Sequence, residues 1–244
     1  MHLPQPHLYC VRCRFHREIC LCSEARRVGT ELRVFIILHA VETFKLSNTG
    51  HLAHLVMPNC QLAVHGRRRG PPADLSELRN SDPDHPVKTI LLHPGLGARE
   101  LTGDYVQELR APNADGIPMR LRLVVPDGTW SQARRMVKRL PELAHLPRVM
   151  LPAVPASVAR AAMRPRTNPD AAERVSTCEA IASAVGLLGE DAAEAALYAV
   201  YDAAALRVAL LRGKIALTDH RSLLRPETPQ SEGVVEHLFI QHER

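Results

Sequence analysis

The chain has 244 residues, of which 45% are hydrophobic and 4% aromatic, which suits one aliphatic-cored domain with room for a small appendage. A formal net charge of +5 permits a polyanionic partner but does not demand one. No apolar run approaches the roughly 20 residues that cross a bilayer, and the first residues lack the basic and apolar regions of a signal peptide. We therefore expect a cytoplasmic protein with no membrane partner, a compartment in which disulfides rarely persist.

Four cysteines lie close together near the start of the chain: Cys10, Cys13, Cys20 and Cys22. Four thiolates at this spacing can bind one zinc ion tetrahedrally, and a site closed by four protein ligands is structural rather than catalytic. The alternatives are a redox-sensitive pair or cysteines that fill a core. We expect residues 1–30 to form a small zinc knuckle, and the isolated Cys60 and Cys178 to be packed.

Residues 32–40 form a continuous apolar run, typical of a strand buried on both faces of a parallel sheet. After a polar loop, residues 52–56 have helical spacing and residues 60–66 are expected to form a second short strand. Residues 67–87 are rich in Pro, Asp and Arg, which predicts a surface loop with a short helix.

Residues 87–95 are expected to form a strand that stops at Pro-Gly, and residues 96–110 are expected to be helical. A strong apolar strand at 121–126 leads through the turn at 127–130 into a helical pattern, SQARRMVKRL. Its apolar stripe is predicted to consist of Ala133, Met136, Val137 and Leu140.

Residues 147–152 are expected to be a further strand, followed by a long irregular stretch at 153–176. A helix at 177–189, with Gly189 as its stop, and a second helix at 191–212 are predicted next. We assign residues 31–225 to the main domain and residues 226–244 to a polar tail.

Strands that alternate with helices predict an α/β fold with a mostly parallel sheet flanked by helices. Such sheets bind ligands at the carboxyl ends of their strands. Three strand ends carry distinctive loops in this sequence, at 39–50, 93–97 and 127–130. The ligand site is therefore expected at this edge.

The turn after the strand at 121–126 contains Asp127, Gly128, Thr129 and Trp130. The amides of a helix N-terminus bind polar or anionic groups, Asp127 could accept a proton, and Trp130 could stack on a base. Alternatively, Asp127 or Thr129 only caps the helix and Trp130 anchors the core. The exposed face of the helix carries basic residues that contact either phosphate or solvent: Arg134, Arg135, Lys138 and Arg139.

Four blocks, in order, resemble the DTW-domain proteins, the tRNA-uridine aminocarboxypropyltransferases. They are CVRCRFHREICLC (10–22), HAVETFKLSNTG (39–50), DGTWSQARRM (127–136) and STCEAIA (176–182). The resemblance runs from about residue 10 to about residue 214. It implies transfer of the 3-amino-3-carboxypropyl group of S-adenosylmethionine to N3 of a tRNA uridine. It also implies kinship with SPOUT-like enzymes, in which a knotted C-terminal half binds the cofactor.

Site residues follow from combining the resemblance with the strand-end loops. Asp127 is expected to be the base or an orienting group, and Glu179 is the second candidate carboxylate, with helix capping as its alternative. The cofactor loops are expected to contain Asp127 itself and His93, Pro94, Gly95, Gly128, Thr129, Trp130, Ser176, Thr177 and Cys178. The substrate side is expected to contain Glu42, Lys45, Ser47, Asn48, Thr49, Arg134, Arg135, Lys138 and Arg164.

Two alternatives are kept: an RNA methyltransferase that uses the same cofactor, and a non-catalytic zinc-containing module that binds RNA. The expected ligands are S-adenosylmethionine, a structural zinc ion and tRNA. The protein is expected to be a monomer or a small homo-oligomer.

Overall fold

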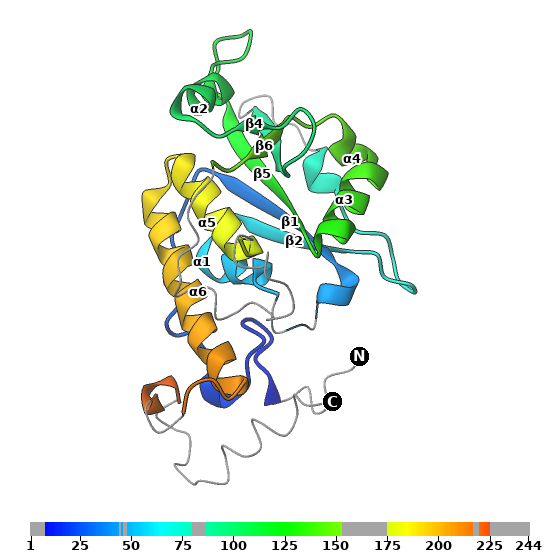
Figure 1. The fold of residues 1–244 in the computed structure, drawn as a ribbon. Helices are drawn as coiled ribbons and strands as arrows, with labels where there is room; N and C mark the ends of the chain where they lie inside the picture. The colour runs from blue at the N-terminus through cyan, green and yellow to red at the C-terminus, as the bar shows by residue number, and fades with distance from the viewer. Residues whose placement is uncertain are drawn as a thin grey trace.

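The computed structural model describes residues 8–43, 45, 48–79, 86–152, 175–216 and 220–224. Within them, six strands form one sheet in the order β2-β1-β5-β3-β6-β4 (Figure 1), and every pairing is parallel. The strands are Arg33–His39 (β1), Cys60–His65 (β2), Val87–Leu92 (β3), Arg99–Glu100 (β4), Arg120–Asp127 (β5) and Arg148–Met150 (β6). The predicted α/β fold with a parallel sheet is confirmed.

Helices cover both faces of this sheet (Figure 1). They are Ala53–Val56 (α1), Gly103–Arg110 (α2), Trp130–Arg139 (α3), Pro141–Ala144 (α4), Thr177–Leu187 (α5) and Asp191–Leu211 (α6). The predicted knot depends on the path of residues 153–174, which lie outside the described residues, as does the tail at 226–244. No helix in the described ranges is both long enough and apolar enough to cross a membrane.

The two faces of the sheet have separate cores because successive strand residues point to opposite sides. Val34 and Ile36 face the larger core, which contains the buried sides of α1, α2, α5 and α6. Phe35 and Ile37 face the smaller core, beneath α3 and α4. Both sides of the central strands are thereby buried, as their continuous apolar sequence predicts.

The segment at 96–110 differs from the expectation of a continuous helix. Gly97 lies in the loop after β3 and has a φ of +78°. This left-handed conformation interrupts the helix that was expected there. The short strand β4 follows, and α2 begins at Gly103, where the Thr102 side chain accepts a hydrogen bond from the amide of Tyr105. The helix is therefore confined to the second half of the predicted segment. Gly189 does end α5 as predicted, with a φ of +87°.

The cysteine-bearing segment packs on the sheet through the larger core, to which Phe15, Ile19 and Leu21 belong. The buried Arg207 of α6 fixes it in place. Its Nε donates to the carbonyl oxygen of Ile19 at 2.7 Å, and its guanidinium forms an ion pair with Glu24. Because a buried charge requires hydrogen-bond partners, these two interactions hold α6 against the cysteine-bearing segment.

We expect Arg207→Met to lower the free energy of unfolding by about 3 kcal/mol, because it leaves the buried carbonyl oxygen of Ile19 without its donor and removes the ion pair with Glu24. Urea denaturation measures the change. The matched variant Glu24→Gln keeps the hydrogen bond from Arg207 to Ile19, so its free energy of unfolding should fall by less. An unchanged unfolding midpoint for Arg207→Met would show that this contact does not hold the N-terminal segment in place.

Candidate active site

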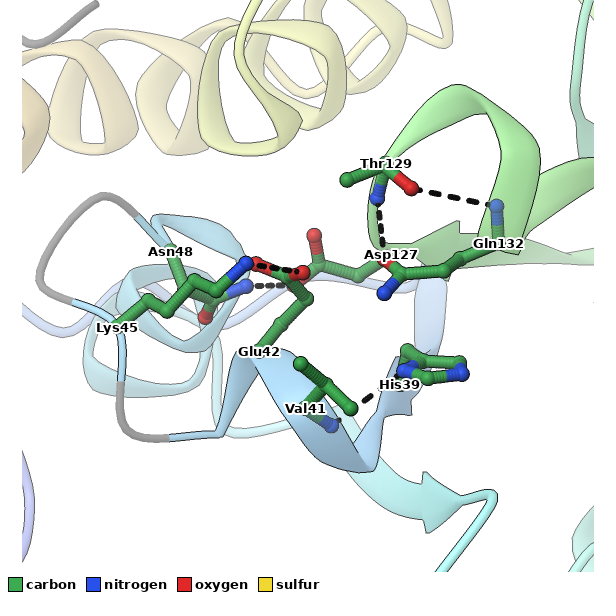
Figure 2. Close-up of polar contacts among 8 residues, drawn as sticks. All are labelled: His39, Val41, Glu42, Lys45, Asn48, Asp127, Thr129 and Gln132. Atoms are coloured by element: carbon green, nitrogen blue, oxygen red, sulfur yellow. Dashed lines mark hydrogen bonds and ion pairs between the residues drawn. The ribbon is translucent and has the colours of Figure 1, made fainter. Parts of the chain in front are cut away.

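Asp127 is the last residue of β5, in the middle of the sheet, and its side chain is only 2% exposed. Parallel pairing places it beside Leu38, one residue before the end of β1. Asn48 Nδ2 donates to Asp127 Oδ2 at 2.7 Å, and Thr177 Oγ1 donates to Oδ1 at 2.6 Å. Each carboxylate oxygen is thus held by a different segment. The loop after β1 holds one oxygen, and the first residue of α5 holds the other (Figure 2 shows the Asn48 bond).

Burial raises the pKa of Asp127 above its ordinary value. The hydrogen bonds from Thr177 and Asn48 oppose this rise, the nearby Glu42 adds to it, and Arg14 opposes it. Burial is the largest of these effects. The carboxylate is therefore a stronger base than an exposed aspartate.

Gly50 allows the loop after β1 to come this close to the carboxylate. A Cβ atom at residue 50 would lie 2.2 Å from Asp127 Oδ2 and 3.2 Å from Thr177 Cγ2. These distances exclude any side chain, so the glycine is required by packing rather than by its backbone angles. The sequence predicts only that Gly50 belongs to the loop at 39–50, and it gives no sign of this contact.

His51 connects the Asp127 site to the cysteine segment. Its Nε2 lies 3.1 Å from the carbonyl oxygen of Cys13, and its Nδ1 lies 3.4 Å from Asn48 Oδ1. Burial, assisted by the charge of Arg14, lowers the pKa of His51 to about 3, so the ring is neutral and carries a single N–H. That N–H can donate to only one of the two oxygens, so His51 contacts both Cys13 and Asn48 but hydrogen-bonds to one of them.

Arg14 makes a second connection from the same segment. It has a φ of 64°, unusual for a residue with a side chain, and its Nη1 donates to the carbonyl oxygen of Thr43 at 2.9 Å. Burial lowers the pKa of Arg14, and the charge of Asp127 opposes that change. Arg14 was not among the expected site residues. Its only sequence signal is its position inside the cysteine block.

The loop after β1 presents a buried acid and an exposed base. Glu42 is 7% exposed and accepts a hydrogen bond from Lys45 Nζ at 2.8 Å, while Lys45 remains half-exposed (Figure 2). Thr49 is buried, and its Oγ1 accepts from the amide of Cys178 at 3.1 Å. Ser47, expected on the substrate side, lies outside the described residues.

Thr129 is the N-cap of α3. Its Oγ1 accepts from the amide of Gln132 at 3.3 Å, and Gln132 Oε1 accepts from the amide of Thr129 at 2.7 Å (Figure 2). This reciprocal capping box confirms the capping alternative for Thr129. Gly128 accommodates it, because a Cβ there would lie 2.9 Å from Gln132 Oε1.

Trp130 begins α3 and is 45% exposed, so the alternative that it anchors the core is wrong. Its ring meets the imidazole of His93 edge to face, with centroids 6.5 Å apart. His93 follows β3, is 8% exposed, and has no hydrogen-bond partner for either ring nitrogen among the described residues. Pro94 and Gly95 follow it in an exposed loop. An unpaired buried imidazole beside an exposed indole is an arrangement that a ligand can complete.

The start of α5 supplies the remaining wall. Ser176 caps the helix, with its Oγ accepting from the amide of Glu179, and Glu179 Oε2 accepts from the amide of Ser176 at 2.9 Å. The capping alternative for Glu179 is therefore confirmed. Cys178 is fully buried, with Sγ 3.9 Å from the carbonyl oxygen of Leu197, and Cys60 is buried as well. Both isolated cysteines are packed, as expected.

The predicted basic residues of α3, Arg134, Arg135 and Lys138, are all exposed, while Ala133, Met136 and Val137 are buried as its apolar stripe. Arg164, expected to bind a carboxylate or phosphate, lies outside the described residues.

The sulfur atoms of Cys10, Cys13, Cys20 and Cys22 all lie within 4.8 Å of one another. Two of the pairs, Cys10 with Cys22 and Cys13 with Cys20, are 3.6 Å apart. Tetrahedral zinc with bonds of about 2.3 Å places its sulfur ligands about 3.8 Å apart. The cluster could therefore hold a metal ion such as zinc.

A family model described as "DTW domain" matches residues 7–209 of the chain. No solved structure matches the chain.

We expect Asp127→Asn to raise the melting temperature at neutral pH, because the buried charge is removed. The pKa of Asp127 is raised by folding, so its contribution to stability is fully present below the unfolded pKa and is lost as the pH rises through the folded pKa. The stability gain of the variant should therefore shrink as the pH is lowered. Thermal denaturation across pH tests this, and a gain independent of pH would contradict it. Exposed Asp115→Asn is the control and should show no gain.

Proposed function

Because the chain belongs to the DTW domain family, we propose that it transfers the 3-amino-3-carboxypropyl group of S-adenosylmethionine to N3 of a tRNA uridine. Family membership is consistent with a tRNA-modifying enzyme. The observation that carries the proposal is that all four sequence blocks of the resemblance converge on Asp127. Two blocks hold its oxygens through Asn48 and Thr177, the third contains it, and the fourth lies nearby, with Cys13 in contact with His51 and the charge of Arg14 acting on Asp127.

Asp127 is the base in this proposal. Uridine N3 carries a proton that must leave as the new nitrogen–carbon bond forms, and a positioned carboxylate can accept it. Asn48 and Thr177 occupy one site on each oxygen, which leaves further lone pairs for the proton. Burial raises the pKa of the carboxyl, which strengthens the base.

The cofactor is assigned to the edge that His93, Trp130 and the start of α5 share. S-adenosylmethionine, when bound, supplies the alkyl group on a sulfonium, which is a good leaving group. The unpaired nitrogens of His93 and the exposed face of Trp130 fit an adenine, which offers both hydrogen-bonding atoms and a π-face. Pro94, Gly95, Gly128, Ser176 and Thr177 line this edge largely through backbone groups.

Glu179 and Thr129 are positioning residues in this assignment. Glu179 fixes the Ser176 turn, which in turn aims the Thr177 hydroxyl at Asp127, and Thr129 fixes the start of α3 beneath Trp130. Glu42, Lys45 and Thr49 surround the carboxylate from the substrate side. Arg134, Arg135 and Lys138 contact tRNA phosphates, because exposed cations bind the RNA backbone without reading its sequence.

The test is mass spectrometry of nucleosides after the purified protein has been incubated with S-adenosylmethionine and tRNA from cells that lack the protein. We expect a uridine that carries the aminocarboxypropyl group. A methyl increment would instead indicate a methyltransferase. Binding of tRNA with no cofactor affinity in calorimetry would indicate a non-catalytic RNA-binding module.

Asp127→Asn should reduce transfer by on the order of 100-fold or more, the usual contribution of a general base, and should bind S-adenosylmethionine as the wild type does. Initial rates and calorimetry measure the two quantities. Activity of the wild type should fall as the pH is lowered through the raised pKa of Asp127. Near-normal turnover in the variant would remove Asp127 from the base role, and parallel loss of cofactor affinity would make it an orienting residue.

The four-cysteine site is proposed to hold one structural zinc ion. Cys13→Ala should lose the metal, as measured by elemental analysis, and should unfold at a lower temperature, because Cys13 also presents its carbonyl to His51 and lies in the larger core. The matched variant Cys60→Ala removes a buried thiol outside the cluster and should keep the metal. Equal metal content in both variants would contradict a zinc knuckle.

A further inference from the structure

The loop after β2 carries three consecutive arginines, at residues 67–69, whose side chains are exposed. Gly66, with a φ of +84°, turns the chain away from the strand just before them. None of the three forms an ion pair with a residue in the described ranges. Three unneutralised cations side by side repel one another, so a solvated loop gains nothing from them.

The exposed face of α3 has the same character. Arg134, Arg135, Lys138 and Arg139 are exposed and form no ion pair within the part of the chain that is described. Other arginines are neutralised in place, as Arg79 is by Glu142 and Arg122 is by Glu77. Among the described residues, acidic side chains therefore pair with these arginines but not with the α3 face or the 67–69 loop.

His39, the last residue of β1, lies between these two groups. A Cβ at Gly66 would be 3.4 Å from His39 Nε2, and a Cβ at Gly128 would be 3.3 Å from His39 Cβ. Burial lowers the pKa of His39, and Arg135 is among the positive charges that act in the same direction. The glycines that precede the arginine loop and α3 thus both lie against His39, at the carboxyl edge that contains Asp127 (Figure 1 shows the loop emerging on the side of α3).

We propose that residues 67–69 and the exposed basic face of α3 form one phosphate-binding surface for an RNA backbone, which crosses the carboxyl edge beside Asp127. The proposal rests on the proposed function, because it takes tRNA as the partner. Arginine forks match phosphate oxygens in pairs. The partner is RNA rather than an anionic lipid surface because these cations lie at the carboxyl edge beside Asp127, where the proposed function places a tRNA uridine, and an RNA backbone supplies phosphates next to that uridine.

The test compares two triple-alanine variants that remove equal charge. One replaces residues 67–69, and the control replaces Arg26, Arg27 and Arg120, which are exposed and belong neither to the 67–69 loop nor to α3. Binding of unmodified tRNA is measured by fluorescence anisotropy over a range of salt concentrations. Each phosphate contact contributes about 0.7 to 0.9 to the slope of log K against log salt concentration, so the 67–69 variant should lose about 2 to 3 of the slope. The control should retain it.

Three outcomes would overturn the proposal: a wild-type slope in the 67–69 variant, an equal loss of slope in the control, or preferential binding to anionic vesicles over tRNA. The first two outcomes concern only this surface, because tRNA binding and modification by the wild-type protein would still be observed and the proposed function would stand. Absence of tRNA binding by the wild-type protein would instead overturn the proposed function along with it. Circular dichroism should show both variants folded, since all the substituted side chains are exposed.

Discussion

The pair of hydrogen bonds to Asp127 is the constraint on which the site depends. Asn48 approaches one oxygen from the segment after β1, and Thr177 approaches the other from the first residue of α5. Segments 79 and 50 residues away from Asp127 along the chain are thereby brought to one carboxylate at the end of a central strand. The absence of a side chain at Gly50 makes this approach possible. Burial makes the carboxylate costly to ionise, so its position relies on donors from both sides.

The cysteine segment is joined to this site rather than appended to the domain. Its apolar residues belong to the larger core, Arg207 bonds its backbone from α6, and His51 links Cys13 to Asn48. The four-cysteine cluster and the carboxylate are therefore connected through residues in direct contact, Cys13 with His51, His51 with Asn48, and Asn48 with Asp127. A change in the turn at Cys13 should therefore affect the position of Asn48, because residues in direct contact are energetically coupled.

The fold could largely be predicted from sequence because the central strands are buried on both faces and read as continuous apolar runs. β4 could not, because two exposed residues carry no periodic signal. Asp127, Asn48 and Thr177 were expected at the site from their strand-end positions and the family resemblance. The roles of Gly50, His51 and Arg14 depend on contacts between distant segments, which no local pattern encodes. Thr129 and Glu179 belong to the capping-box patterns T-x-x-Q and S-x-x-E, so their helix-capping role could be predicted from the sequence.

Trp130 is the only tryptophan in the chain. It is partly exposed, at the edge where the ring nitrogens of His93 have no hydrogen-bond partner among the described residues. Indole emission is sensitive to the polarity around the ring and to a neighbouring imidazole. The tryptophan emission of this protein, excited at wavelengths that its four tyrosines do not absorb, therefore originates entirely from the candidate site. Binding of a ligand at that edge can therefore be followed in real time, without a label, as a change in the fluorescence of Trp130.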